Sequence, residues 1–332
     1  MQRIARKAFP THIFVFLLPA IIIYTLFMIY PLFDSLRLSF YDQSVINQPA
    51  TGNLLNIQAP NFLALVATRT SQPIYVGLDN FHTLLGDPNW AGQFKNALGN
   101  NFVFFSIHML VQNPLALFLA TLLTAKFLRG RAIYRTLIFA PTTLSVVIIG
   151  FIWKLLLNQN WGIVDGFLKG IGLGALIQPW LGSDITALPV VSLISVWQWV
   201  ALPMVLFMAA LVSIPEELLE AARVDGASAW RIFTEIKFPL VLPTVGIVGV
   251  LTFVGNFNAF DLIYTMQGLL ATPNYHTDIL GTFFFRTFYG FQLKSGNPTM
   301  GTTIAAMMFL IILTGVLIYM FGWQRRIARI QG

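Results

Sequence analysis

The sequence predicts an all-α polytopic membrane protein with six transmembrane helices and a cytoplasmic loop between the fourth and the fifth. Two observations support this fold class. The 332 residues are 56% hydrophobic and only 10% charged, whereas charged residues make up about 25% of an ordinary soluble domain. Several apolar stretches also reach the roughly 20 helical residues needed to cross the hydrocarbon core of a membrane. We therefore expect membrane lipid around most of the chain.

The predicted spans follow from where those apolar stretches begin and end. They cover residues 13–33, 97–124, 136–157, 187–212, 241–267 and 300–323. The first span follows basic residues, as a secretory signal does, but it is longer than a signal core and no small-residue cleavage site follows it, so we expect it to be retained. No internal repeat or soluble domain is evident, and residues 1–332 are expected to form a single transmembrane domain.

The long segment 34–96, between the first two spans, is predicted to lie on the external side. Four prolines in it disfavour a continuous helix. They are Pro49, Pro60, Pro73 and Pro88.

The distribution of positive charge predicts the orientation. If the N-terminus is cytoplasmic, 13 of the 20 Lys and Arg residues flank the spans on the cytoplasmic side, as the positive-inside rule requires. Both termini and the loop 213–240 are then cytoplasmic. The net charge of +7 does not indicate a nucleic-acid partner, because Lys and Arg lie beside apolar spans and do not cluster on one exposed face.

The residue types needed for several kinds of chemistry are missing or scattered. The chain has no Cys, which excludes disulfides, thiolate metal sites and Cys nucleophiles. Its four His residues lie far apart in the sequence, and we expect them to be packing or interfacial residues. They are His12, His82, His108 and His276. No metal or other cofactor and no catalytic residue is expected in this chain.

The loop 213–240 contains the start and stop signals of two short helices. Ser213 and Glu216 have the spacing of a capping box, with Pro215 in the first turn. Gly226 is placed to end this first helix, because Gly accepts the left-handed conformation of a sharp turn. A second helix is predicted from about residue 228 to 237, before Pro239.

Small residues on the first of these helices give the loop two possible roles. Ala221 and Ala222 have small side chains, so another protein could approach the backbone of this helix closely. An ordinary interfacial connector would have the same pattern. The residues alone leave both alternatives open.

This loop resembles the EAA motif of ABC importer permeases. The matching residues are Glu220-Ala221-Ala222, Gly226, Ile236 and Pro239, with Phe238 where the family has Leu. The fuller pattern is similar to the branch of the family that imports carbohydrates. It includes Ile214-Pro215, Glu217-Leu218, Asp225-Gly226-Ala227 and Pro243.

The resemblance extends over most of the chain. Further similar stretches are YPLFDSLRLSF at 30–40, VGLDNF at 76–81 and FNAFDLIYTM at 257–266. Two departures lie outside the cytoplasmic loop. They are the segment 44–75, which is longer than expected, and Gly268-Leu269-Leu270 in place of a Gly-Gly-Pro turn.

The resemblance implies a permease subunit in a bacterial-type plasma (inner) membrane that does not itself hydrolyse ATP. Its partners would be a second, homologous permease subunit forming a heterodimer, two ATPase subunits holding ATP and Mg, and an external solute-binding protein. The solute would be a sugar or a sugar-like oligosaccharide, polyol or osmolyte. The chain has no GxxxxGK[ST] phosphate loop, in agreement with this division of roles. The loop would act as the coupling helix, through Glu220, Ala221, Ala222, Asp225, Gly226, Ala227 and Pro239.

Polar residues at membrane depth are candidates for the substrate path. Asp261 lies in the predicted fifth span and Asn258 lies three positions earlier, so the two would share a helix face and line a common cavity. Structural hydrogen bonds to a neighbouring helix are the alternative. Trp197, Gln198 and Trp199 combine the aromatic and polar groups that sugar sites use, and they suit helix packing equally well.

Other polar residues and other function classes have weaker support. Gln112-Asn113-Pro114 is interpreted as a helix kink and not as a site. An ion-coupled secondary carrier would need an ion or proton site, for which Asp261 alone is thin support. A membrane-embedded enzyme would need a nucleophile, a metal cluster or paired acids at membrane depth, and we see none in the sequence.

Overall fold

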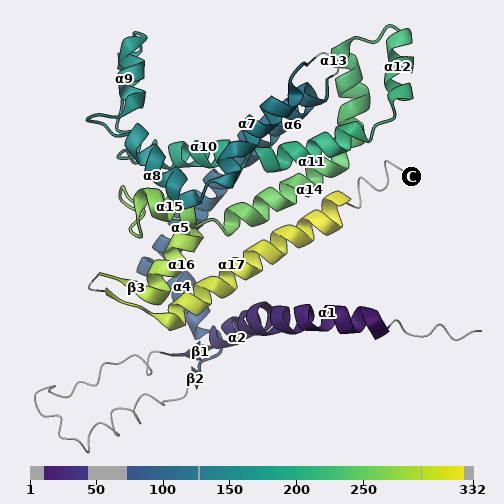
Figure 1. Cartoon of the computed structure of the whole chain (residues 1–332). Coiled ribbons are helices and arrows are strands. Elements are labelled where there is room, and N and C mark those ends of the chain that lie inside the picture. The colour runs from purple at the N-terminus through teal and green to yellow at the C-terminus, as the bar shows by residue number, and fades with distance from the viewer. Residues whose placement is uncertain (1–10, 44–72, 126–127, 293, 325–332) are drawn as a thin grey trace, which may run out of the picture.

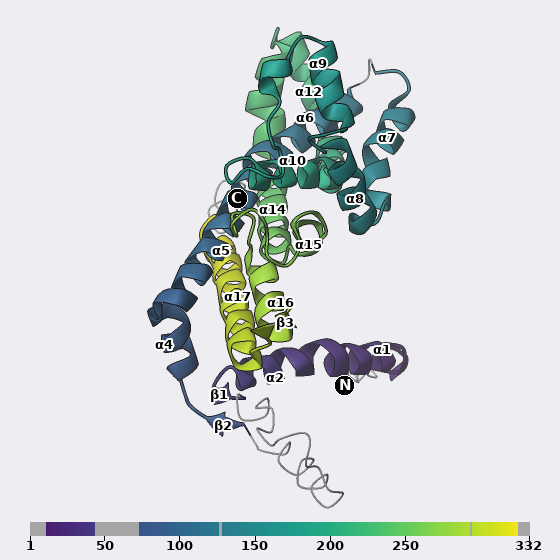
Figure 2. The ribbon, with the colours of Figure 1, turned by 90° about the vertical axis from the view of Figure 1, so that its left-hand side faces the viewer.

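The computed structural model describes residues 11–43, 73–125, 128–292 and 294–324, and the fold is almost entirely helical. The first span is a continuous helix made of α1 (Thr11–Tyr24), the π-helical turn η1 (Thr25–Ile29) and α2 (Tyr30–Leu38). Only α2 packs on the helix bundle, against α17 (Pro298–Ile318). Figures 1 and 2 show α1 extending away from the other helices. Accordingly, every side chain from Phe16 to Phe33 is exposed in the isolated chain.

The predicted external segment 34–96 contains more helix than expected. Its described parts include the end of α2, the antiparallel pair β1 (Tyr41–Asp42) and β2 (Ile74–Tyr75), and the helix α4 (Asp79–Gly86). Two of the segment's four prolines, Pro49 and Pro60, lie between 44 and 72, outside the described residues. The Nδ2 of Asn80 donates to the carbonyls of Ser39 and Tyr41 and so ties α4 to the end of the first span.

The second span is longer than predicted. It joins α5 (Pro88–Ile107), the π-helical turn η5 (His108–Gln112) and α6 (Asn113–Thr124) into one helix of 37 residues. The helix begins at Pro88 because the Asp87 side chain accepts from the backbone N–H groups of Asn89 and Trp90, and proline is well placed in a first turn. The π-helical turn lies just before Pro114, where the sequence predicted a kink.

The third and fourth predicted spans are each broken. Within 136–157 the structure has α7 (Arg131–Thr143) and α8 (Val146–Leu156), bent by 97°. The break occurs at Leu144, which is extended, and Ser145 caps α8 by accepting from the N–H of Ile148. Within 187–212 lie α10 (Ala187–Trp199) and α11 (Ala201–Val212), bent by 47°. Between the two pairs lie α9 (Ile163–Gly170) and the short η6 (Gly174–Leu176).

The loop 213–240 and the predicted fifth span differ from the prediction in two ways. After α12 (Glu216–Val224), the helix of α13 (Ala229–Ile232), η7 (Phe233–Lys237) and α14 (Phe238–Phe257) runs through Pro239 without ending. A π-helical turn immediately before a proline supplies room for its ring. The predicted span 241–267 is also interrupted, because α14 ends at Phe257 and a separate helix α15 (Asp261–Gln267) follows.

The last part of the chain forms α16 (Leu280–Tyr289), the short hairpin β3 (Gly290–Phe291) and β4 (Lys294–Ser295), and α17, which continues into η8 (Tyr319–Gln324). Among the described residues, four helices are long and apolar enough to cross a membrane, and the number is six if each bent pair is counted as one span. The count of six therefore stays a prediction.

Three clusters of buried apolar side chains hold the bundle together. The first joins α6, α11 and α14, where the fully buried Ala116 and Ala120 let α6 approach Phe207 on α11. The second surrounds Ile149 and Ile263 where α8, α10 and α15 meet. The third surrounds Phe257, Phe283 and Ile304, between α14, α16 and α17. The ends of several helices meet between the first two clusters.

Candidate functional site

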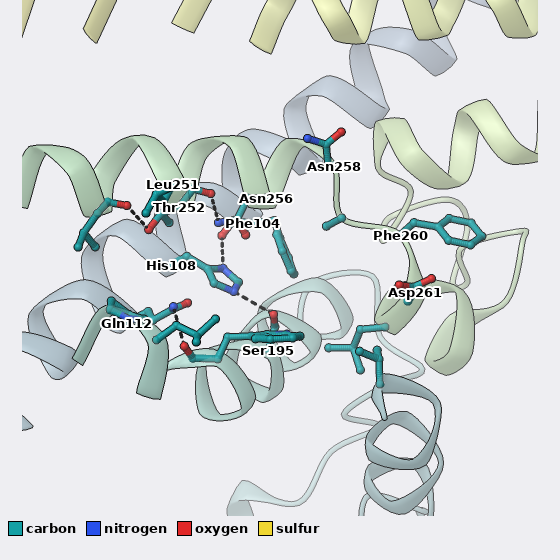
Figure 3. Close-up of a pocket in the computed structure, with 18 of the residues that line it drawn as sticks. Phe104, His108, Gln112, Ser195, Leu251, Thr252, Asn256, Asn258, Phe260 and Asp261 are labelled. Atoms are coloured by element: carbon teal, nitrogen blue, oxygen red, sulfur yellow. Dashed lines mark hydrogen bonds between the residues drawn. The ribbon is translucent and has the colours of Figure 1, made fainter. Parts of the chain in front are cut away.

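A cavity of about 510 Å³ lies where three helices are interrupted. Its walls come from η5 in the second span, from the break between α10 and α11, and from the break between α14 and α15. Figure 3 shows the side chains of His108, Gln112 and Ser195 directed toward a common space, whereas those of Asn258 and Phe260 point away from these three. Backbone that departs from a regular helix at membrane depth is tolerated where it lines a cavity or is buried in protein. The three helix interruptions therefore lie together around a single cavity.

His108 and Ser195 form a buried polar pair on one wall of the cavity. The His108 Nδ1 lies 2.8 Å from the carbonyl oxygen of Phe104, and its Nε2 lies 3.0 Å from the Ser195 Oγ. A carbonyl oxygen only accepts, so Nδ1 carries the proton in the neutral ring and Nε2 accepts from the Ser195 hydroxyl. Two nitrogens with partners explain why a histidine that is 3% exposed can be accommodated here. His108 therefore lines the cavity, in addition to the packing role that the sequence predicted for it.

Gln112 presents an acceptor without a partner. Its Nε2 donates to the carbonyl oxygen of Trp199 at 3.3 Å, whereas its buried Oε1 has no hydrogen-bond partner among the described residues. An unsatisfied buried acceptor costs about 1–3 kcal/mol. Gln112 belongs to the cavity lining, and Figure 3 shows its amide oxygen directed to the His108 and Ser195 side of that space.

The α14 wall is held by hydrogen bonds within the protein. The Thr252 Oγ1 donates to the carbonyl of Val248 at 2.8 Å and also contacts the Asn113 Oδ1 at 3.3 Å. The Asn256 Nδ2 donates to the carbonyl of Thr252 at 2.7 Å. Asn256 lines the cavity together with Asn258 and Asp261.

Asn258 and Asp261 both line the cavity, though not for the predicted reason. They do not share a helix face, because Asn258 caps the end of α14 and Asp261 begins α15 after a break. The Asn258 Nδ2 donates to the carbonyl of Val254. Figure 3 shows the Asp261 carboxylate at the start of α15, where a negative charge is favoured by the helix dipole.

The three candidates on α10 have different surroundings. Trp199 lines the cavity and accepts from Gln112 through its carbonyl. Trp197 lies outside the lining and packs edge-on against Trp153 of α8, with ring centroids 5.6 Å apart. Gln198 is fully buried and donates through Nε2 to the carbonyl of Leu144 at 3.4 Å, which ties α10 to the break between α7 and α8. The structure thus brings one of these three residues to the cavity.

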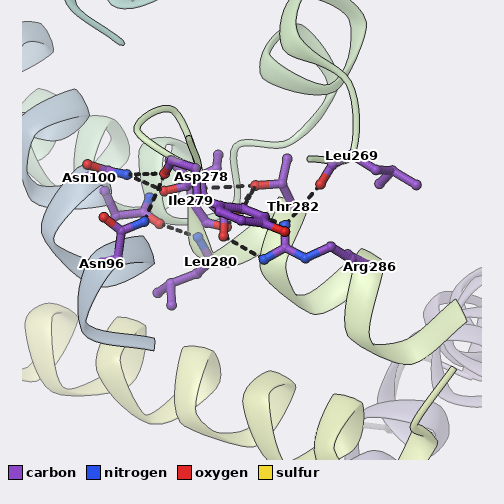
Figure 4. Close-up of polar contacts among 10 residues, drawn as sticks. Asn96, Asn100, Leu269, Asp278, Ile279, Leu280, Thr282 and Arg286 are labelled. Atoms are coloured by element: carbon purple, nitrogen blue, oxygen red, sulfur yellow. Dashed lines mark hydrogen bonds and ion pairs between the residues drawn. The ribbon is translucent and has the colours of Figure 1, made fainter. Parts of the chain in front are cut away.

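A second set of polar contacts secures the turn between α15 and α16. The Asp278 carboxylate is 1% exposed and lies 2.8 Å from the Arg286 guanidinium, which also donates to the carbonyl of Leu269. The Thr282 hydroxyl donates to the same carboxylate, and the Asn100 side chain of α5 donates to the Asp278 carbonyl. Figure 4 shows these contacts converging on Asp278. They hold the end of the turn against α5 and α16.

The loop 213–240 has the predicted turn but not the predicted cap. Pro215 is the N-cap of α12 and makes no side-chain cap bond, and the Ser213 hydroxyl donates to the carbonyl of Ala210, so the capping-box interpretation was wrong. Gly226 has a φ of +79°, as predicted for the turn. The N–H of Ala227 donates to the carbonyl of Ala222 across it.

The first helix of this loop is open to a partner. None of its residues is buried, and Glu220, Ala221 and Asp225 are exposed while Ala222 and Ala227 are half-buried. Pro239 is exposed on the following helix. Figure 1 shows α12 at the edge of the molecule, away from the third cluster. Among the described residues, no group of three or more His, Asp or Glu side chains could hold a metal ion.

Comparisons with known proteins agree with this arrangement. The family model for the inner membrane component of binding-protein-dependent transport systems matches residues 112–329. A probable ABC transporter permease protein of Pyrococcus horikoshii is 32% identical over 77% of this chain and 80% of its own length. The glucose import system permease protein of Saccharolobus solfataricus is 31% identical over 77% of this chain and 86% of its own.

A solved structure has the same fold. It is a bacterial ABC transporter involved in the import of the acidic polysaccharide alginate, and its matching chain is 23% identical, with a TM-score of 0.71 over 97% of this chain and 96% of that one. The family match covers well over half of the chain and includes most of the cavity lining and the loop 213–240. The chain therefore belongs to the family of inner membrane components of binding-protein-dependent transport systems.

Proposed function

We propose that this chain is the permease subunit of an ATP-binding-cassette importer and that its cavity forms part of the translocation path for a sugar or sugar-like solute. The observation that carries the proposal is the polar cavity at three helix interruptions in a chain of this transport family. The solute class is supported by relatives whose names state glucose, multiple sugars and lactose as their solutes. Oligosaccharides, polyols and related osmolytes belong to the proposed class.

The complete importer contains further subunits. An external binding protein delivers the solute, a second, homologous permease subunit forms the other half of the path, and two ATPase subunits hold ATP and Mg. The chain spans the membrane six times if each bent helix pair is one span, with both termini on the cytoplasmic side. The prediction of a cytoplasmic C-terminus is supported by Figure 1, where the start of α1, the end of η8 and α12 lie toward the same side of the molecule.

The helix interruptions give the cavity a means of opening to either side. The break between α14 and α15 and the bend between α10 and α11 divide its walls into segments that can move as rigid bodies. Alternating access about a fixed site near interrupted helices is a common transporter mechanism. In this mechanism Asn258, Asp261 and Trp199 face the solute, while Trp197 and Gln198 hold α10 in place.

The loop 213–240 transmits the movement of the ATPase. Its exposed helix α12 carries the apolar side chains Leu218 and Val224, the latter 87% exposed, and Trp230 follows on α13. Exposed apolar side chains beside small residues suit insertion into a groove of another protein. Glu220, Ala221, Ala222, Asp225, Gly226, Ala227 and Pro239 are the proposed coupling residues. The helix that begins at α13 continues into α14, which connects the loop directly to the cavity wall.

Uptake measurements test this function against the ion-coupled alternative. The purified complex is reconstituted in liposomes with the binding protein, and a panel of labelled sugars and polyols is offered. Uptake should require both hydrolysable ATP and the binding protein, and it should stop with a non-hydrolysable ATP analogue. Uptake driven by a proton or sodium gradient in the absence of both would contradict the proposal and favour a carrier.

Site-directed labelling tests whether the cavity is the path. The chain has no native Cys, so Asn258→Cys introduces a single thiol at the cavity. A maleimide should block import by this variant, and the transported solute should slow the labelling. As a matched control, labelling of Trp161→Cys, an exposed position outside the cavity lining, should leave import unchanged. Labelling at Asn258→Cys without loss of import would exclude this cavity from the path.

A further inference from the structure

The hydroxyl and amide donors of the cavity lining are partly used within the protein. The amide nitrogens of Gln112, Asn256 and Asn258 each donate one hydrogen bond there and keep a second N–H. The hydroxyl of Thr252 donates to a carbonyl, and that of Ser195 is used by the Nε2 of the neutral His108. The remaining donors are neutral, and a neutral donor does not compensate the charge of an anion as Lys or Arg would.

The lining also offers acceptors to a solute. The Asp261 carboxylate, which only accepts when ionised, is exposed and lines the cavity. The Ser195 oxygen keeps acceptor lone pairs after donating to His108. The Gln112 Oε1 has no partner among the described residues, but it is closed off from the cavity in this conformation. A solute with hydroxyl groups can donate to the acceptors that are accessible.

The charge of the lining points in the same direction. Among the described residues that line the cavity, Asp261 is an ionisable carboxylate and no Lys or Arg is present. Arg286 is committed to the buried Asp278 and lies outside the lining. A carboxylate in a partly desolvated cavity repels a second negative charge more strongly than it would in water. An acidic solute would meet this repulsion without a compensating cation from this subunit.

We propose that this cavity selects neutral, hydroxyl-rich solutes over acidic ones, with Asp261 excluding anions. The inference rests on the proposed role of the cavity as the translocation path and specifies its substrate class. It separates this chain from the structurally similar transporter whose solute is the acidic polysaccharide alginate. Apolar faces of Phe104, Phe260 and Trp199 complete a lining suited to the less polar faces of a sugar ring.

The test compares matched neutral and acidic probes in the absence of the binding protein, because that protein has a specificity of its own. The complete transporter in lipid nanodiscs is titrated with lactobionamide and lactobionate, and with gluconamide and gluconate, by saturation-transfer difference NMR. The members of each pair differ only in an amide or a carboxylate. The neutral member should bind roughly tenfold more tightly than the acidic member, as expected for a charge pair at short range in a partly desolvated site.

One variant and a matched control assign the effect to Asp261. Asp261→Asn should bring the two affinities of each pair to within about twofold. Asp184→Asn removes an exposed carboxylate outside the cavity and should change neither affinity. Basal ATPase activity and size-exclusion profiles check that each variant complex is intact.

The outcomes separate this inference from the proposed function. Equal binding of both members, preference for the acids, no saturable binding of the neutral probes, or a ratio unchanged by Asp261→Asn would each overturn the inference. ATP-dependent and binding-protein-dependent uptake is measured separately in liposomes. If that uptake is present while the probes do not discriminate, only the charge selectivity is wrong.

Discussion

The Ser195 Oγ lies 3.0 Å from the Nε2 of His108, and this buried hydrogen bond connects α10 to the π-helical turn of the second span. The same imidazole is held by the Phe104 carbonyl, so its ring cannot turn without losing one of the two partners. Two of the three helix interruptions around the cavity are linked in this way. The pair fixes the relative position of two cavity walls.

Removing His108 should destabilise the transporter. His108→Leu leaves the Ser195 hydroxyl and the Phe104 carbonyl without this partner, at an expected cost of about 1–3 kcal/mol. The thermal unfolding midpoint of the purified complex should fall accordingly. A double-mutant cycle with Ser195→Ala provides the control, because the double variant should lose less than the sum of the two single losses. Strictly additive losses would show that the pair does not couple the two helices.

Breaking the ion pair between Asp278 and Arg286, which lies outside the cavity, should destabilise the protein more than removing His108 does. Removing one partner from a buried ion pair costs about 3–5 kcal/mol, because the other charge is left uncompensated. Asp278→Ala should therefore reduce the amount of assembled complex and its thermal midpoint. Asp184→Ala, which removes a carboxylate that is 40% exposed, is the matched control and should have little effect. Equal stability of the two variants would contradict the structural role of this pair.

The sequence predicted the membrane class and the turn at Gly226 well, because both depend on local chemistry. Apolar composition marks a membrane protein whatever its packing, and a Gly at the end of a short helix predicts a left-handed turn that Gly226 indeed adopts. The resemblance of the loop to the EAA motif of importer permeases is confirmed by the family match over residues 112–329. That match also favours the importer over the ion-coupled carrier.

The cavity could be predicted only in part. Asn258 and Asp261 were predicted to line a cavity because polar side chains are costly within a membrane. The break between α14 and α15 was missed because the hydropathy of the sequence continues across it. His108 and Ser195 lie 87 positions apart, so no sequence pattern connects them. Gln112 was interpreted as part of a kink. The predicted kink did indicate the cavity, since interrupted helices form its walls. A polar residue at such an interruption could therefore have been recognised as a site candidate.

The orientation of the chain can be tested with paired single cysteines. Val224→Cys on α12 and Ile185→Cys before α10 replace two strongly exposed residues, and the chain has no Cys of its own. In intact cells, a membrane-impermeant maleimide added outside should label Ile185→Cys and leave Val224→Cys unlabelled. Permeabilised cells should show labelling of both. External labelling of Val224→Cys in sealed cells would be incompatible with a cytoplasmic coupling loop.

Gly226 provides the sharpest test of coupling. Its φ of +79° is a conformation in which a β-branched residue carries strain of about 1–3 kcal/mol. A Cβ added at this position would meet no atom within 4 Å, so the effect of Gly226→Val should come from the backbone and not from a clash within this chain. The turn should open and displace Glu220, Ala221 and Ala222 from the ATPase. Import and solute-stimulated ATP hydrolysis should fall sharply.

The insertion of the subunit should survive this change, because the apolar spans determine insertion and the turn lies outside them. The membrane level of Gly226→Val should therefore be close to that of the unmodified protein, while co-purification of the ATPase or its stimulation by the solute-loaded binding protein is lost. Gly226→Asn is the matched control, since Asn enters the left-handed region more easily than other non-glycine residues and should retain more coupling than Val. If Val and Asn reduce coupling equally, added bulk at the partner surface explains the effect, and if neither reduces it, the loop is not the coupling element.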